Sequence, residues 1–227
     1  MAEFKQKYFG SIRGKFGDAV FRQRGDKNYI SKRANYKKPE TEEFKMRTDT
    51  FKFSCQLASQ INNNQYLKAI WQTQLGKQIF PGLVSLNYNA FKNGTLAKNP
   101  MITPDKGIGV KVDSLTMTGD LLKLKLKPLT EASTVDTVIE KKIMSVLYVV
   151  LTEPVNVLDE KLKIIPLSST KAEINLETEL ELNNFVSTAN SDFILKYGNK
   201  NAFATVLTFD ENDLLVNYAN TFSAEIV

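Results

Sequence analysis

The residues of this chain that most resemble a ligand-binding motif lie near its N-terminus. Gly10, Gly14 and Gly17 surround Lys15 in the stretch GSIRGKFG. A phosphate-binding Walker loop needs a serine or threonine directly after its lysine, whereas Phe16 follows here. The glycine spacing also differs from that of a dinucleotide-binding turn. The pattern therefore favours glycines that bend an extended segment over a phosphate site.

Basic residues interleaved with aromatic residues fill the same region. Residues 1–38 carry eleven Lys/Arg and three acids, a net charge of +8, whereas the rest of the chain carries −3. Such a segment can neutralise phosphates and stack bases, or it can dock on an acidic protein surface. We favour a protein partner, because a purely electrostatic segment would need fewer apolar side chains. The candidate partner-binding residues are Arg13, Lys15, Phe16, Arg22, Arg24, Tyr29 and Arg33.

Other candidate motifs have simpler structural explanations. The acids of TFDENDLL, Asp210, Glu211 and Asp213, could hold calcium, but acidic residues also suit a solvated hairpin turn. The RGD at 24–26 is explained by a turn. The chain has no histidine and one cysteine, Cys55, which excludes Ser-His, Cys-His and zinc-hydrolase designs. We recognise no catalytic residue, metal ligand or cofactor motif, and we predict that the chain is not an enzyme.

Two of three predicted regions precede residue 100. Residues 1–40 are expected to form an extended basic arm with a β-ribbon, in which AVFRQ and NYISKR flank a turn at Gly25-Asp26. Residues 41–99 are expected to form a small helical region, since Glu42 and Glu43 favour the positive end of a helix dipole. Its apolar stripe is predicted to contain Phe44, Phe51, Cys55, Ala58 and Ile61.

The third region, residues 100–227, changes to a period of two. LLKLKLKPL at 121–129 alternates leucine with lysine, which is typical of a strand with one buried face. Runs of this kind, separated by turns, predict an all-β immunoglobulin-like sandwich. The predicted fold class is therefore α+β, with an arm, a helical region and a C-terminal sandwich.

The order of these parts resembles that of a group of phage and bacterial proteins. The resemblance is carried by GSIRGKFGDAVFRQRGDKNYISKR, followed by KKPET, FKMR and YNAFKNG. A glycine and valine pattern is shared with these proteins: Gly10, Gly14, Gly17, Val20 and Gly25. The chain is most similar in this respect to auxiliary capsid proteins of crAss-like tailed phages. The resemblance implies a virion structural role, with the arm running over capsid protein, and it supplies no catalytic residues.

We therefore expect a virion structural protein, an auxiliary or decoration protein present in many copies. Its expected partner is the major capsid protein or another virion protein, and it would be made in the host cytoplasm. A nucleic-acid-binding protein that uses the same arm is the alternative. No apolar run reaches the roughly 18–20 residues that span a bilayer, so no membrane partner is expected.

Overall fold

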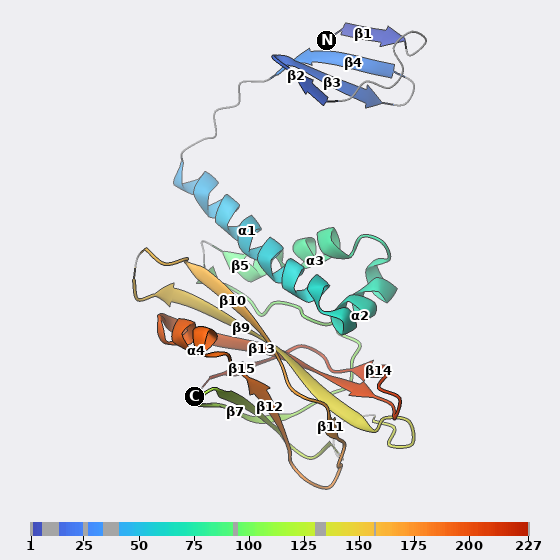
Figure 1. Cartoon of the computed structure of the whole chain (residues 1–227), viewed down its shortest axis with the longest axis vertical. Coiled ribbons are helices and arrows are strands. Elements are labelled where there is room, and N and C mark those ends of the chain that lie inside the picture. Colours follow the sequence, from blue (N-terminus) through green and yellow to red (C-terminus); the bar gives the residue numbers. More distant parts are fainter. Residues whose placement is uncertain are drawn as a thin grey trace. The chain divides into compact units, whose positions relative to one another are not determined.

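The described residues of the N-terminal unit, Met1–Thr41, form four short strands, and this unit is one of two into which the chain divides. The computed structural model describes residues 2–5, 14–24, 27–33, 41–92, 95–129, 135–156 and 158–226. The strands are β1 (Ala2–Lys5), β2 (Gly14–Phe16), β3 (Ala19–Arg24) and β4 (Lys27–Lys32). They pair antiparallel in the order β1-β4-β3-β2 (Figure 1).

The β3–β4 pair occupies the two runs that were predicted to form a ribbon. Arg24 pairs with Lys27, so two residues connect the strands. Those two, Gly25 and Asp26, lie outside the described residues. The extended basic arm is not confirmed, because β1 and β2 widen the ribbon into a four-stranded sheet.

The second unit, Glu42–Val227, begins with a group of helices and a small hairpin. These elements are α1 (Glu42–Asn63), α2 (Gln65–Leu75), α3 (Ile79–Asn87), the 3-10 helix η1 (Tyr88–Ala90), β5 (Phe91–Lys92) and β6 (Thr95–Leu96). The remaining elements form two antiparallel sheets and one further helix. They are β7 (Val112–Thr118), β8 (Leu121–Leu126), β9 (Lys142–Pro154), β10 (Leu162–Ser168), β11 (Ala172–Glu173), β12 (Leu180–Phe185), α4 (Thr188–Leu195), β13 (Tyr197–Phe209), β14 (Leu215–Tyr218) and β15 (Phe222–Glu225).

Two long strands, β9 and β13, form the centre of the larger sheet. They pair along their whole length, from Lys142 opposite Phe209 to Pro154 opposite Tyr197. Each outer edge is built from two short strands in succession, β10 then β11 beside β9, and β14 then β15 beside β13. Both edges of this sheet are therefore interrupted.

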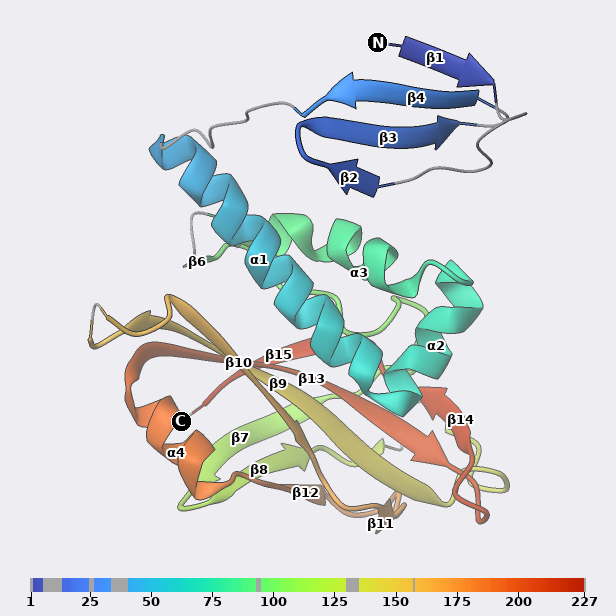
Figure 2. The same ribbon diagram turned by 45° about the horizontal axis from the view of Figure 1, so that its top comes forward.

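The larger sheet is covered on both faces, which gives the second unit three layers (Figure 2). Alternation along β9 sends Val146 and Tyr148 toward the helices, and Leu147 and Val149 toward the three-stranded sheet β12-β8-β7. The apolar run IMSVLYVVL is thus explained, since a strand buried on both faces has no polar side. In β8, the alternation prediction is confirmed: the leucines at 122, 124 and 126 are buried between the sheets.

Helix α1 begins at the predicted acids, and the predicted stripe faces the core only in part: Ala58 and Ile61 are buried as expected. Its buried apolar side chains are Phe53, Leu57, Ala58 and Ile61, whereas Phe51 is 56% exposed. Phe44 and Cys55 are not among the buried side chains either. The helix ends at Asn63, and Asn64 caps α2 by accepting hydrogen bonds from the backbone N–H groups of Tyr66 and Leu67.

The segment 101–108 ties the helical layer to the break between β14 and β15. Trp71 donates its indole N–H to the carbonyl of Ile102, at 2.7 Å. Thr221, in the break, accepts hydrogen bonds through Oγ1 from the backbone N–H groups of Ile102 and Thr103. Gly107 packs so closely that an added Cβ would lie 2.5 Å from the carbonyl oxygen of Tyr218. A side chain at position 107 therefore has no room.

The observed fold class is α+β with antiparallel sheets, as predicted at that level. The immunoglobulin-like arrangement is not confirmed. Residues 41–99 do not stand apart from the β-region, because their buried side chains share one core with β9 and β13. Helix α4 is inserted between β12 and β13, in the region that was predicted to be all-β.

Candidate binding surface

The pairing register of the N-terminal sheet assigns its side chains to two faces. Residues directly opposite each other in an antiparallel pair share a face, and successive residues alternate. Arg22 lies opposite Tyr29, and Arg24 lies opposite Lys27. Lys15 lies opposite Val20, two residues before Arg22, so it belongs to the same side. We call this side, defined by Lys15, Arg22, Arg24, Lys27 and Tyr29, the basic face.

The basic face contains a shallow hollow of about 420 Å³. Its lining residues are Arg22, Gln23, Arg24, Tyr29 and Ser31. The two guanidinium groups offer hydrogen-bond donors only, and the hydroxyls of Tyr29 and Ser31 can also donate. Both arginines are exposed, and Tyr29 is half-buried. This set of donors suits an anion with several oxygen atoms.

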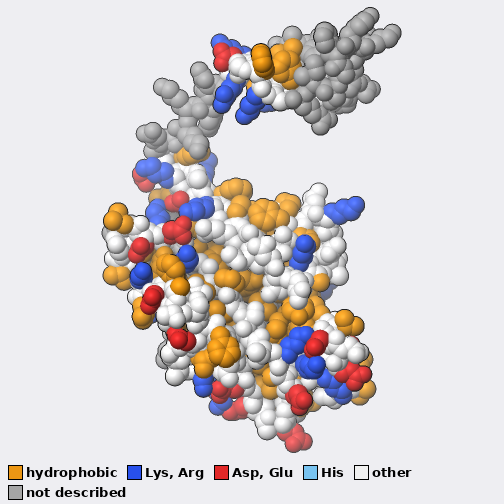
Figure 3. All heavy atoms as spheres, in the orientation of Figure 1, with side chains coloured by type: hydrophobic (Ala, Val, Ile, Leu, Met, Phe, Trp, Pro, Cys, Tyr) orange, Lys and Arg blue, Asp and Glu red, His pale blue; other side chains and the backbone are white. Residues whose placement is uncertain are grey.

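One acid, Glu3 of β1, lies opposite Tyr29 in the pairing of β1 with β4. Asp18 is the one acid in residues 14–24 and 27–33, and it lies in the turn between β2 and β3. Within the described part of the chain, neither Arg22 nor Arg24 is joined to an acidic side chain. In Figure 3, the described part of this unit shows Lys and Arg side chains beside hydrophobic ones. The arginines are therefore available to an external anion.

The predicted partner-binding residues do not all share this surface. Phe16 lies opposite Ala19, on the other face, together with Phe21 and Ile30. Phe16 is 80% exposed. Arg33 follows β4, where its backbone N–H donates to the carbonyl of Asp18, and Arg13 lies outside the described residues. Four of the seven predicted residues, Lys15, Arg22, Arg24 and Tyr29, are thus brought together, and their role in binding stays a prediction.

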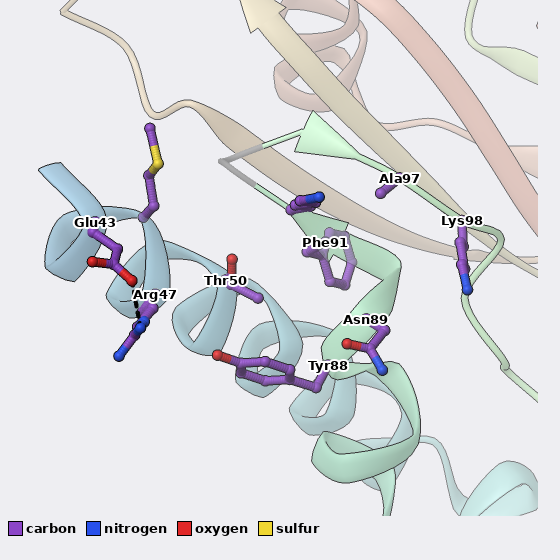
Figure 4. A pocket seen from close by; sticks show the side chains of 10 residues that line it. Glu43, Arg47, Thr50, Tyr88, Asn89, Phe91, Ala97 and Lys98 are labelled. Atoms are coloured by element: carbon purple, nitrogen blue, oxygen red, sulfur yellow. Dashed lines mark hydrogen bonds and ion pairs between the residues drawn. The ribbon is translucent and has the colours of Figure 1, made fainter.

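A second concavity, of about 540 Å³, lies in the second unit between the first turns of α1 and the η1–β5–β6 segment (Figure 4). Glu43 and Arg47 form an ion pair at its rim, and Tyr88 and Phe91 supply aromatic lining. Nothing in its lining combines a nucleophile with a base. Sequence reasoning missed this concavity, because residues 41–99 were expected to form a helical region, whereas Phe91–Lys92 and Thr95–Leu96 pair as strands.

The acids of the turn that could have held calcium make contacts within the protein instead. Asp210 accepts a hydrogen bond from the backbone N–H of Leu214. Asp213 pairs through Oδ1 with Lys142 at 2.9 Å and with Lys171 at 3.1 Å. Hydrogen bonds from these lysines, Lys142 first, lower the pKa of the Asp213 carboxyl below its usual value. Two of the three acids thus have partners within the fold: Asp213 forms ion pairs, and Asp210 accepts a backbone hydrogen bond.

The remaining reactive groups do not converge either. Burial raises the pKa of the Cys55 thiol, which makes it a poorer nucleophile at neutral pH. Among the residues that the structure describes, no group of three His, Cys, Asp or Glu side chains could hold a metal ion. The same residues include no helix that is long and apolar enough to cross a bilayer.

Comparisons with known proteins assign no family. No protein-family model and no curated protein matches the chain. Among solved structures, the chain is similar to the alkylpurine DNA glycosylase AlkC of Pseudomonas fluorescens, bound to DNA that contains an abasic site analogue. The TM-score is 0.25 at 10% identity, and the match covers 82% of this chain and 46% of the glycosylase chain. A likeness at this level assigns no function to this chain.

The prediction that the chain is not an enzyme is corrected at this point. The structural neighbour is an enzyme, so the prediction is withdrawn. The neighbour's activity is not transferred to this chain, and the described residues receive no catalytic role.

Proposed function

We propose that this chain is a virion structural protein, an auxiliary or decoration protein that binds a phage capsid through its N-terminal unit. The observation that carries the proposal is the basic face, a cluster of exposed cations on a unit of its own. The sequence resemblance described above supports the same role. The partner is the major capsid protein or another virion protein, and many copies assemble on one particle.

The two units divide the work in this proposal. The N-terminal unit docks by pairing Lys and Arg with acidic groups of the partner and by burying apolar side chains such as Phe16. The second unit holds itself together through two cores of its own and is displayed on the particle. We retain the immunoglobulin-like relationship only as part of this proposal; two antiparallel sheets around a shared core support it.

Truncation tests the proposal. The full chain and a variant that lacks residues 1–41 are each co-expressed with the major capsid protein of a crAss-like tailed phage, and the particles are purified by sedimentation. The full chain should sediment with the particles, whereas the variant should stay in the soluble fraction. Circular dichroism of the variant serves as the control for folding. Full incorporation of a folded truncated variant would contradict the proposal.

Nucleic-acid binding is the second candidate, because the hollow on the basic face would also accept phosphate oxygens. Phosphate neutralisation is strongest at low salt. A gel-shift series over increasing salt, with single-stranded and duplex DNA, tests this candidate. The absence of any shift at the lowest salt would exclude it.

A further inference from the structure

The basic face is built from two arginines on one strand, and their spacing restricts what they can bind. Arg22 and Arg24 lie on the same side of β3, two residues apart, and therefore about 6.8 Å apart along the strand. A guanidinium group presents its N–H donors as a planar fork that fits both oxygens of a carboxylate. Two such forks in a row fit two carboxylates at similar spacing. Acidic residues at alternate positions of an extended segment provide that spacing.

We infer that the basic face recognises an acidic protein segment in which Asp or Glu occupies alternate positions. Arg22 and Arg24 would each bind one carboxylate of this segment. This inference rests on the proposed function, since it names the chemistry by which the N-terminal unit would hold its virion partner. Tyr29 lies directly opposite Arg22, and Ser31 lines the same hollow. Their hydroxyls can donate to the remaining carboxylate oxygens.

The distribution of aromatic side chains favours protein over nucleic acid. Surfaces that bind single strands stack successive bases on aromatic rings placed among their cations. The register places Phe16 and Phe21 on the face opposite the arginines, so Tyr29 is the aromatic ring on the basic face among residues 14–24 and 27–33. One half-buried ring does not make a row of stacking positions. A row of carboxylates requires none.

A second copy of this chain is a poorer occupant than another protein. The chain has its own alternating acids, Glu177, Glu179 and Glu181. Glu179 pairs with Lys125, and Glu181 pairs with Lys123, on the outer side of the three-stranded sheet. Glu177 also lies in a bend of the backbone, so these acids lack the regular spacing of an extended segment that the two guanidinium forks require. The segment to be recognised therefore belongs to a different protein.

Arginine-to-lysine exchange tests the inference in the full chain, because it keeps the charge and removes the fork. The probes are a fluorescent peptide of alternating Glu and Ser, the same peptide with Gln for Glu, and a single-stranded DNA of equal charge. The variants are R22K/R24K and R22Q/R24Q. The matched control is K68Q/K77Q, which removes two exposed cations from the second unit. Binding is measured by fluorescence anisotropy at two salt concentrations.

We expect the Glu peptide to bind and the Gln peptide not to bind. R22Q/R24Q should weaken binding of the Glu peptide roughly tenfold or more, as the loss of two charge-assisted contacts predicts. R22K/R24K should lose a clear part of that affinity, and K68Q/K77Q should match the original chain. Equal binding by R22K/R24K, or tighter binding of the DNA than of the Glu peptide, would overturn the inference.

The same variants separate this inference from the proposed function. R22Q/R24Q is carried through the particle-sedimentation assay beside the variant that lacks residues 1–41. If the truncated variant is lost from particles while R22Q/R24Q is retained, the virion role stands and the carboxylate contact is wrong. If the truncated variant itself is retained, the virion role is wrong.

Discussion

The two units of this chain differ in how many of their described side chains are buried. Among residues 14–24 and 27–33 of the N-terminal unit, Asn28 is the one buried side chain. The second unit buries two separate apolar cores, one on each face of its larger sheet. A sheet gains stability mainly from an apolar face that is covered. The comparison teaches that the second unit supplies stability, while the N-terminal unit keeps its side chains available for contacts.

The sharpest test of this comparison removes one phenyl ring from each unit. Phe203 in β13 is 1% exposed and belongs to the core beneath the helices. Phe203→Ala should lower the free energy of unfolding by about 3–5 kcal/mol, because a large buried side chain leaves a cavity. Phe16→Ala should change it by less than about 0.5 kcal/mol, because Phe16 is exposed. Urea unfolding measures both, with fluorescence of the buried Trp71 reporting on the second unit and amide hydrogen exchange of β3 and β4 reporting on the N-terminal unit. Similar losses for the two variants would break the comparison.

A glycine in the second unit tests how tightly segment 101–108 binds the sheet. Gly107→Ala would place a methyl group against the backbone of Tyr218 and Ala219. We expect a loss of about 1–3 kcal/mol, because backbone atoms cannot move aside easily. Gly119→Asn is the control: Gly119 has a φ of 59° with open space around it, and Asn tolerates that conformation. Thermal unfolding should separate the two variants clearly; equal midpoints would contradict the close packing at Gly107.

A single hydroxyl should have a smaller effect. The Tyr148 hydroxyl donates to the carbonyl of Gln60 at 3.2 Å, which links the larger sheet to α1. Tyr148→Phe keeps the packing and should cost about 0.5–1.5 kcal/mol. Tyr88→Phe, at a ring that is 37% exposed, should be neutral. Chemical unfolding measures both losses. A larger loss for Tyr88→Phe than for Tyr148→Phe would show that the Tyr148 hydroxyl does not link the sheet to α1.

The smallest predicted effect depends on pH. The pKa of Asp213 is lowered in the folded chain, so its ionised form is stabilised there by Lys142 and Lys171. Its contribution is fully present above the ordinary value of 3.8 and is lost as the pH falls through the lowered value. Asp213→Asn should therefore have a slightly lower melting temperature than the original chain at pH 7. The difference should shrink in acid; a difference independent of pH would show that the ion pairs do not cause it.

Local sequence patterns predicted several elements because local physics determines them. The acids at 42 and 43 marked the start of α1, and the leucine-lysine alternation of β8 marked which side chains face the core. The predicted stripe of α1 was right at Ala58 and Ile61, which are buried, and wrong at Phe51, which is exposed. Phe53, two positions later, is buried instead, and it is selected by tertiary packing in the core beneath the helices, which no local pattern specifies.

The N-terminal sheet shows where sequence reasoning stopped. β1 pairs with β4, whose residues lie some distance along the chain, and no local pattern specifies that contact. The sequence could, however, have predicted that the basic and the aromatic side chains lie on opposite faces. Once AVFRQ is assigned as a strand, Arg22 and Phe21 must point to opposite faces. The prediction grouped Phe16 with the arginines because it treated the ribbon as one surface.

The interrupted edges of the larger sheet have a consequence for how this chain behaves when crowded. An uninterrupted outer strand offers a template on which another chain can add a strand, and such growth leads to fibrous aggregates. Here β10 contains Pro166 and gives way to β11, while segment 101–108 is hydrogen-bonded into the gap between β14 and β15. Neither margin offers a long, regular template. At high concentration, the larger sheet should therefore add little to edge-to-edge association between copies.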